Sequence, residues 1–211
     1  MPSKRADKSP ISEDNLRELY ALIEAPVTAF NCGTLCSPTN DGVPFCCDRD
    51  QLFPVLWKTE LAMHRKWSDF WEERPPEDAL ERRMLKSMRP CFTVGECAGP
   101  EHCEREKRSI SCRTFPFEPY LDHTGELVGL VFDHRFGMRC PLAGEERFDD
   151  VTPKFIDQAL RFFTRLFEID PKEVEAYLGT SEQKRRSFAQ KGRPVPVLTR
   201  KGVKQYPTSA R

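Results

Sequence analysis

The chain has nine cysteines among 211 residues, and this cysteine content constrains the fold more than any other feature. Hydrophobic residues make up only 38% of the chain, whereas about 45–50% is usual in globular proteins. The length suits a single domain, but the apolar core that the chain can bury is modest for that length. Its 18 prolines favour short elements joined by fixed turns, because each internal proline removes a backbone donor. We therefore expect metal ligation by the cysteines to hold together loops that the limited apolar core cannot fix alone.

The polar and apolar segments predict the compartment in which the cysteines work. Met1–Lys8 is charged and polar with no apolar stretch behind it, which is unlike a secretory signal peptide. The longest apolar run, Leu127–Phe132, is far short of the ~20 residues that span a bilayer. We therefore expect a cytoplasmic protein with no membrane contact. Disulfides rarely persist in a reducing compartment, so the cysteines indicate metal or redox chemistry.

The charges are balanced overall but unevenly distributed along the chain. Lys plus Arg and Asp plus Glu each number 33, yet residues 183–211 hold nine basic residues and no acidic one. The preceding part is therefore acidic, which argues against a general nucleic-acid binder, because such proteins present a basic face. The basic tail allows at most a weak contact with nucleic acid. A disordered, solubilising tail is favoured, because the tail lacks the interleaved aromatic residues of a stacking platform.

The apolar periodicity and the turn residues predict helices of differing length and one β-hairpin. Ser12 is a typical N-cap for the first helix, and Pro153 stands at the first helical position of a later one. Two apolar runs separated by Asp122–Gly125 have the composition of a hairpin. The predicted helices are one from Ser12 that stops before Pro26, a long one at about 51–73, a shorter one from 76 or 77 to about 88, one from Pro153, and one from Asp170 that stops at Gly179; the predicted strands are Thr114–Tyr120 and Leu127–Phe132.

These elements indicate an α+β fold in which helices pack around cysteine-rich irregular loops and a small β-hairpin. The cysteines fall mainly in two segments predicted to be irregular, Asn31–Asp48 and Cys91–Cys112. We expect three parts: a flexible leader at 1–10, a cysteine-cluster metal-binding domain at 11–180, and a basic, disordered tail at 181–211.

The spacing of the cysteines suits metal ligation but does not select the metal. Thiolates two to four residues apart in a loop can bind one ion, and Cys32 and Cys36 have this spacing. The adjacent pair Cys46–Cys47 is more specific, because neighbouring side chains of an extended chain point in opposite directions. The two could serve different sites, or one could bind metal while the other packs. The same thiolates suit tetrahedral zinc or an iron–sulfur cluster. The alternative for any single cysteine is that it packs as a small buried hydrophobe.

Several of these motifs resemble the YkgJ-type cysteine-cluster family, also called the zinc- or iron-chelating CxxCxxCC domain. The similarity covers about residues 30–142 and comprises Phe30-Asn31-Cys32 with Cys36, the Cys46–Cys47 pair, Cys91-Phe92, Cys103 with Cys112-Arg113-Thr114-Phe115-Pro116, and a late Cys140. Arg108 lies four residues before Cys112, as the family arginine does. The chain departs from the family in the longer gap between Cys36 and Cys46, in the shorter gap between Cys103 and Cys112, in Ser109 where proline is usual, and in Cys97, which has no obvious counterpart.

The resemblance implies a metal-binding protein that holds zinc or iron, or an iron–sulfur cluster, through its thiolates. The expected ligands are Cys32, Cys36, Cys46, Cys47, Cys91, Cys103, Cys112 and Cys140. Eight thiolates would satisfy two four-ligand sites, or one site with the remaining thiols structural. One alternative function is an iron–sulfur redox protein. The family also reaches proteins described as flagellin lysine methylases, so a protein-lysine methylase-like enzyme is a second alternative, although no independent methyl-donor motif is present.

The histidines and the aromatic residues are weaker candidates. His64 is expected to be a surface or packed imidazole, His102 a solvated loop residue and His123 part of the hairpin turn, whereas ligation by His134 is the less favoured reading. The aromatic residues of the predicted long helix, Trp57, Trp67, Phe70 and Trp71, could form a binding face, but packing over the cysteine loops is favoured. There is no glycine-rich phosphate cradle and no dinucleotide fingerprint. Since no cysteine is distinguished as a nucleophile and no histidine as its base, no catalytic residue is assigned.

Overall fold

The computed structural model describes residues 10–133 and 139–209 and confirms the α+β class. Helices account for 47% of the described residues and strands for 18%. The helices are α1 (Glu13–Leu22), α2 (Gly33–Cys36), α3 (Lys58–Arg65), α4 (Ala79–Ser87), α5 (Ile110–Thr114), α6 (Pro153–Ile169) and α7 (Lys172–Gln190). The strands are β1 (Val55–Trp57), β2 (Trp71–Glu73), β3 (Phe92–Cys97), β4 (Phe117–Leu121), β5 (Leu127–Phe132), β6 (Val195–Thr199) and β7 (Gly202–Tyr206). The predicted leader lies outside the described residues except for its last position.

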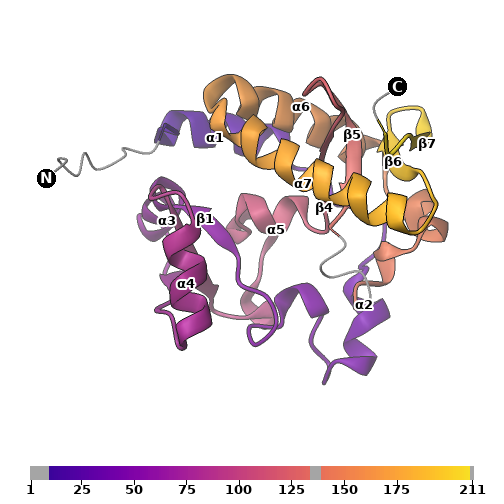
Figure 1. The fold of residues 1–211 in the computed structure, drawn as a ribbon. Helices are drawn as coiled ribbons and strands as arrows, with labels where there is room; N and C mark the ends of the chain where they lie inside the picture. The colour runs from indigo at the N-terminus through magenta and orange to yellow at the C-terminus, as the bar shows by residue number, and fades with distance from the viewer. Residues whose placement is uncertain (1–9, 134–138, 210–211) are drawn as a thin grey trace, which may run out of the picture.

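The strands form two antiparallel sheets. The smaller sheet has the order β1-β3-β2 and the larger one β4-β5-β6-β7. Figure 1 shows α6 and α7 beside the larger sheet with α1 next to α6, while α3 lies with the smaller sheet. The short helix α5 lies between these two halves of the molecule (Figure 1). Because α5 carries Cys112, one cysteine lies at the junction of the two halves.

The main core lies between α1, α6 and the larger sheet. Ser12 caps α1 through a reciprocal capping box with Asn15, which confirms the predicted helix start. Thr152 caps α6 by accepting the Phe155 N–H at 3.2 Å. The inner face of α6 is rich in aromatic residues, among them Phe155 and Phe162, which are almost completely buried. Since each such side chain contributes about 1.5–3 kcal/mol when buried, this one helix supplies much of a core that is otherwise modest.

The predicted long helix at 51–73 is wrong. The segment forms β1, the short helix α3 and β2, and both strands pair with β3. Burial in this sheet outweighs the helical periodicity, because strand formation places Leu56 and Trp71 against Gly95 of β3. A Cβ atom at Gly95 would lie 2.6 Å from Cδ1 of Leu56, so only glycine allows this close packing. The segment Cys91–Cys112, predicted to be irregular, therefore begins with a strand.

The predicted disordered tail at 181–211 is wrong over most of its length. α7 continues through Gly179, where a helix end was predicted, and β6 and β7 extend the larger sheet. Every residue of β6 is buried, and this apolar burial offsets the entropy cost of ordering the segment despite the basic residues around it. Gly129 of β5 permits the contact, because a Cβ there would lie 2.4 Å from Cγ1 of Val197 and 2.7 Å from the Leu198 carbonyl oxygen.

The remaining predicted elements are present with shifted ends. The β4–β5 hairpin turns at Asp122–Gly125, where the Asp122 carboxylate accepts the Thr124 N–H at 2.8 Å. The helices expected before Met88 and after Thr152 correspond to α4 and α6. Within residues 10–133 and 139–209, no helix has the length and apolar character needed to cross a membrane.

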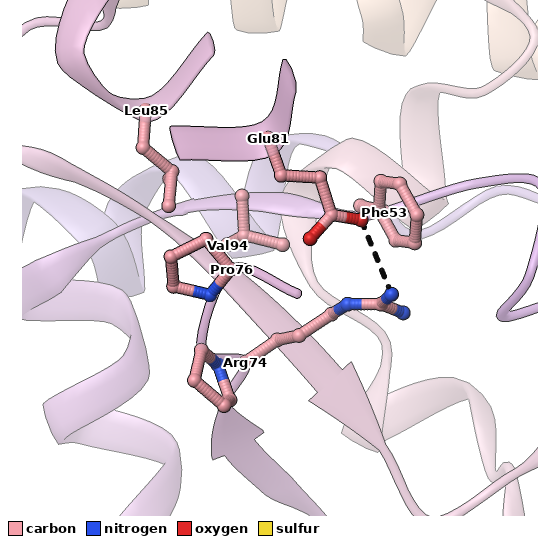
Figure 2. Close-up of a pocket in the computed structure, with 7 residues that line it drawn as sticks. Phe53, Arg74, Pro76, Glu81, Leu85 and Val94 are labelled. Atoms are coloured by element: carbon pink, nitrogen blue, oxygen red, sulfur yellow. Dashed lines mark hydrogen bonds and ion pairs between the residues drawn. The ribbon is translucent and has the colours of Figure 1, made fainter. Parts of the chain in front are cut away.

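A small cavity lies where α4 covers the smaller sheet (Figure 2). The Arg74 guanidinium lies 3.9 Å from the centre of the Phe53 ring and pairs with Glu81 of α4 at 3.3 Å. Leu85 of α4 and Val94 of β3 complete the wall. These contacts attach α4 to the sheet, so we assign the cavity a structural role.

Candidate metal centre

The first cysteine motif is folded around Cys36. This buried thiol accepts the backbone N–H of Phe45 at 3.3 Å. Cys32 stands at the N-cap of α2 and is half-buried. A Cβ atom at Gly33 would lie 2.9 Å from Cγ of Pro44, so glycine lets the two segments approach each other. The α2 segment is therefore held against the turn that carries the adjacent cysteine pair.

The adjacent pair Cys46 and Cys47 lies in a 3-10 turn, Phe45–Cys47, and not in an extended segment. The two sulfur atoms are 3.9 Å apart. The expectation that the side chains point in opposite directions is therefore wrong, because the tight turn brings them together. Cys46 is exposed and Cys47 is half-buried, and both are free thiols. One short turn thus presents two neighbouring sulfur donors.

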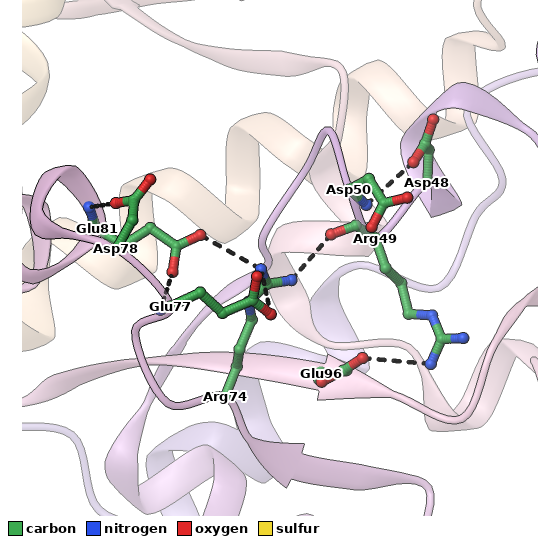
Figure 3. A network of polar contacts seen from close by, with 8 residues as sticks. All are labelled: Asp48, Arg49, Asp50, Arg74, Glu77, Asp78, Glu81 and Glu96. Carbon is green, nitrogen blue, oxygen red and sulfur yellow. Dashed lines mark hydrogen bonds and ion pairs between the residues drawn. The ribbon is translucent and has the colours of Figure 1, made fainter.

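Figure 3 shows how the chain that follows this pair is attached to the smaller sheet. Arg49 pairs with Glu96 at 3.3 Å, and its guanidinium approaches the Cys97 carbonyl oxygen at 3.5 Å. Arg74 donates to the carbonyl oxygen of Arg49 at 2.9 Å. An exposed ion pair contributes little alone, but the three contacts together fix the chain after Cys47 beside the end of β3.

Three further cysteines pack against one small apolar cluster. They are Cys97, Cys103 and Cys112, and the cluster consists of Leu56, Leu61, Phe70 and Trp71. Trp71 organises this region, because its Cα is paired with that of Cys97 across the two strands. Its indole N–H donates to the Lys107 carbonyl oxygen at 2.6 Å. The loop between Cys103 and Cys112 is thereby held at the same aromatic side chain as Cys97.

Arg113 further shapes the loop between Cys103 and Cys112. Its guanidinium donates to the carbonyl oxygens of Arg105 and Glu106 at 3.2 and 3.3 Å. The residue is buried, so these bonds replace hydration that the side chain would otherwise lose. The arginine next to the cysteine of the family motif therefore acts on the backbone of the cysteine loop.

Four of the thiols form one electrostatic group, which we call the Cys112 group: Cys47, Cys97, Cys103 and Cys112. Burial raises the pKa of Cys112 to about 12; a hydrogen bond with Ser109 opposes the rise, and the charges of the other three thiols add to it. Burial also raises the pKa of Cys97, with contributions from Cys47 and Cys103. Such charge effects weaken with distance, and three of the four thiols, Cys97, Cys103 and Cys112, also pack against the same apolar cluster.

A second electrostatic group, the Cys32 group, comprises Cys32, Cys36 and Cys140. Burial raises the pKa of Cys32, and the charge of Cys36 adds to the rise. Burial and the charges of Cys32 and Cys36 raise the pKa of Cys140 to about 11. Cys32 and Cys140 also pack against the edge of the main core. The late cysteine of the sequence is thus brought back to the first cysteine motif.

The adjacent cysteines connect the two groups. Their mutual hydrogen bond raises the pKa of Cys46 well above its usual value and lowers the pKa of Cys47 to about 7. Cys46 is also affected by the charges of Cys112 and Cys32, one from each group. That the two cysteines serve different sites stays a prediction: Cys47 belongs to the Cys112 group, and the charges of both groups act on Cys46.

Arg108 is the basic residue most closely associated with the thiols. Burial lowers its pKa, but a hydrogen bond with Cys103 and the charges of Cys103, Cys47 and Cys112 outweigh this effect and raise it. Its charge also helps to lower the pKa of Cys47. Arg108 is four residues from the nearest cysteine in sequence, so the loop conformation, and not adjacency, places it at the centre.

Cys91, an expected ligand, has different surroundings. It is 4% exposed and belongs to the main core. Burial raises its pKa, the nearby Arg89 opposes the rise, and Asp170 and Glu173 add to it. Arg89 itself pairs with Asp170 at 2.7 Å and with Glu173. The structure therefore places Cys91 next to an ion-paired cluster at the start of α7.

The histidines lie mainly away from the thiols. His64 is 1% exposed, which agrees with the expected packed imidazole. His102 is exposed and lies 3.9 Å from the Glu101 carboxylate, and His123 is exposed in the hairpin turn. His134 lies outside the described residues.

The thiols of each group lie near one another, but in the described part of the chain their sulfur atoms do not converge on a common metal position. Among the described residues, no group of three or more His, Cys, Asp or Glu side chains is already arranged to hold a metal ion. Soft thiolate donors from four chain regions, with one arginine among them, are nevertheless the donor set that zinc and iron–sulfur clusters use.

The sequence did not indicate that Cys97 groups with the other thiols, nor that Arg108 lies among them. The apolar and β-branched segment Phe92-Thr93-Val94 was the available signal for Cys97, because it is typical of a strand and would place the cysteine at a strand end. No local signal identifies Arg108 beyond the family resemblance. Comparisons of the chain with protein-family models, with curated proteins and with solved structures found no match.

Proposed function

We propose that this is a metal-binding protein that holds zinc or iron through clustered cysteine thiolates, as the resemblance to the YkgJ-type family implies. The observation that carries the proposal is the grouping of the cysteines: thiols from Cys32 to Cys140 lie in two adjoining groups joined by one adjacent pair. Thiols that packed independently as small hydrophobes would not be expected to gather in this way.

The proposed ligands form two sets of four. Cys47, Cys97, Cys103 and Cys112 make up the first set. Cys32, Cys36, Cys46 and Cys140 make up the second. Cys97 takes the place of Cys91 in this proposal, because Cys97 packs with Cys103 and Cys112 whereas Cys91 packs in the main core. Four thiolates around a divalent ion carry a net charge of minus two, which Arg108 would partly offset at the first set.

Metal binding would complete the fold of the cysteine loops. Most of the thiols have raised pKa values, so they are protonated near neutral pH when no metal is bound. A metal ion must displace these protons, and its binding free energy then stabilises the loops that supply the thiolates. The proposal places the protein in a reducing compartment such as the cytoplasm, where the ligands stay reduced. The metal ion is the partner that this proposal names, and a weak contact of the basic C-terminal segment with nucleic acid stays a prediction.

The test is elemental analysis combined with an absorption spectrum on protein purified anaerobically without a metal-affinity tag. We expect about one or two metal ions per chain for zinc, in a colourless protein that loses stability when a chelator removes the metal. A brown protein that bleaches in air would instead identify an iron–sulfur cluster, and hence a redox role. A fully folded protein that contains no metal, and takes up neither zinc nor iron with its thiols reduced, would contradict the proposal.

A further inference from the structure

A chain of three hydrogen-bonded side chains lies in the interior beside the thiols. Glu60 and His64 of α3 are 0% and 1% exposed. The hydroxyl of Tyr20, from α1, lies 2.6 Å from Oε1 of Glu60 and 2.7 Å from Nε2 of His64. We refer to Glu60, Tyr20 and His64 as the buried triad. A carboxylic acid, a phenol and an imidazole in contact form a path along which a proton can pass.

The single proton of the Tyr20 hydroxyl allows two arrangements. When it points to Glu60, the carboxylate is ionised and His64 donates from Nε2 to the tyrosine oxygen. When it points to His64, the imidazole carries its proton on Nδ1 and Glu60 is protonated and donates to the tyrosine. The two arrangements therefore differ in the protonation of Glu60 and in the tautomer of a neutral His64.

Both ends of the buried triad have an unused polar atom. Oε2 of Glu60 and Nδ1 of His64 are buried and have no hydrogen-bond partner in the described part of the chain. A buried polar atom without a hydrogen-bond partner destabilises the folded state. Such atoms are rare, and a functional role is one explanation for keeping them. The ring of His64 stacks on Trp67 with centres 5.1 Å apart, and Trp67 is 53% exposed. The His64 end of the buried triad is therefore in contact with a side chain that reaches the surface.

The buried triad is in contact with the helix that carries Cys112. Glu60 Oε1 accepts the backbone N–H of Ile110, two residues before that cysteine, at 2.8 Å. The Arg113 guanidinium, also on α5, lies 4.5 Å from the centre of the Tyr20 ring. The charged or titratable groups that face the triad from neighbouring elements are thus Arg113 and, further away, Cys112, whose charge acts on Tyr20.

We propose that the buried triad is a proton-binding site that takes up one proton when the Cys112 group becomes negatively charged on binding metal. The coupling rests on the proposed function, whereas the proton site itself does not. A proton from water binds Nδ1 of His64, the Nε2 proton passes to the Tyr20 oxygen, and the hydroxyl proton passes to Glu60. Glu60 ends protonated and His64 ends neutral in its other tautomer, so one proton is gained and no other bond changes.

The titration behaviour of the three groups agrees with this proposal. Burial raises the pKa of Glu60 to about 7, although hydrogen bonds from Tyr20 and Ile110 and the charge of Arg113 oppose the rise. Burial and, to a lesser extent, Arg113 lower the pKa of His64 to about 4, so the imidazole stays neutral near pH 7. Burial and the charge of Glu60 raise the pKa of Tyr20 well above its usual value. Glu60 is therefore the group of the triad that changes charge near neutral pH, and added negative charge nearby would raise its pKa further.

The test follows two signals in the full chain between pH 5 and pH 9. The infrared band of a protonated buried carboxyl reports Glu60 when it is recorded in a Glu173→Gln background, because burial raises the pKa of Glu173 to about 7 as well. ¹⁵N NMR reports the tautomer of His64. In metal-free protein we expect both to change together with a midpoint near pH 7. Loading with zinc should move this common midpoint upward by about half a pH unit or more, because thiolate charge stabilises the protonated acid.

Three variants separate the triad from its surroundings. Glu60→Gln should lose the carboxyl band and fix one tautomer of His64. Tyr20→Phe should leave a titrating Glu60 but stop the tautomer from following it. Glu168→Gln, which alters an acid that is 58% exposed on α6, should leave both signals unchanged. If a triad variant does not fold, the measurement on the wild-type protein still decides the question.

The possible failures can be told apart. A Glu60 that titrates at the ordinary value of 4.5, or a His64 tautomer that is constant across the range, would overturn the proton site. Zinc that binds without moving the midpoint would overturn the coupling alone. A protein that takes up no metal would overturn the coupling together with the proposed function, while the metal-free titration would still decide the proton site.

Discussion

Replacing two cysteines one at a time separates the two possible ligand assignments. Cys97→Ser removes a thiol that packs with Cys103 and Cys112, whereas Cys91→Ser removes one that the family resemblance also predicts but that lies in the main core. Both changes are the same in chemistry, since each replaces a sulfur atom by an oxygen. We expect Cys97→Ser to weaken metal binding and Cys91→Ser to reduce stability while leaving metal affinity unchanged.

The expected magnitudes follow from the surroundings of each thiol. A structural zinc site contributes about 10–16 kcal/mol, or roughly 2.5–4 kcal/mol for each of four thiolates. Losing Cys97 should therefore weaken zinc binding about 10²- to 10³-fold, at 1.4 kcal/mol for each factor of ten. Cys91 is 4% exposed, so a serine there buries a hydroxyl group. This should cost about 1–3 kcal/mol, which corresponds to a fall in Tm of roughly 2–12 °C for a chain of this size.

Competition with a chromogenic chelator measures the zinc affinity of both variants, and thermal unfolding of the zinc-loaded proteins measures their stability. The wild-type protein in the same buffer is the reference for both. If Cys91→Ser weakened zinc binding by two orders of magnitude while Cys97→Ser had no effect, the assignment based on packing would be refuted. The ligand set implied by the family resemblance would then stand.

Three further predictions concern the cation, the ion-paired carboxyl and the sheet. Arg108→Met should weaken zinc binding about 10- to 100-fold, measured by the same competition, whereas Arg108→Lys should retain part of the affinity. Burial raises the pKa of Glu173 from 4.5 to about 7, so the folded protein holds that proton more tightly than the unfolded chain. The protonated Glu173 therefore stabilises the fold fully below pH 4.5, and up to about 3 kcal/mol of the free energy of unfolding is lost as the pH rises through 7. Glu173→Gln should reduce the fall in the free energy of unfolding between pH 4.5 and pH 7, measured by urea unfolding. Gly129→Ala should destabilise the protein by about 1–3 kcal/mol, because the added methyl group would collide with β6. Gly179→Ala, at a position of α7 with open space around it, should stabilise the protein by up to about 1 kcal/mol. Equal changes of the two variants in thermal unfolding would contradict the placement of β6.

Capping and turn residues correctly predicted the elements whose ends are fixed by contacts between residues close in sequence. The cap at Ser12, the cap at Thr152 before Pro153 and the turn at Asp122 each involve hydrogen bonds within a few residues, so their sequence patterns were sufficient. The segment 51–73 was predicted wrongly because its structure depends on β3, which lies further along the chain. The segment that forms β6 was predicted wrongly for the same reason, since basic composition concealed five consecutive buried residues.

The candidate site was only partly accessible to sequence reasoning. Spacing indicated that the cysteines act together, but it could not show which thiols share surroundings, because that depends on how the loops return to one another. Cys97 joins the Cys112 group through strand pairing with Trp71, and Arg108 reaches it through the conformation of a loop. The buried triad could not be predicted either, because Tyr20 and His64 are 44 residues apart in sequence and meet only when α1 packs on α3.

The joining of β5 to β6 has a consequence for how the protein would be damaged. β5 and β6 pair through Leu130 and Leu198. A proteolytic cut between α7 and β6 would remove β6 and β7 from the chain but leave all nine cysteines in the larger fragment, because the last of them is Cys140. It would also uncover the hydrogen-bonding edge of β5 and the apolar side chains beneath β6. Exposed strand edges readily pair with other chains. We therefore expect such a fragment to aggregate before it loses any capacity to bind metal.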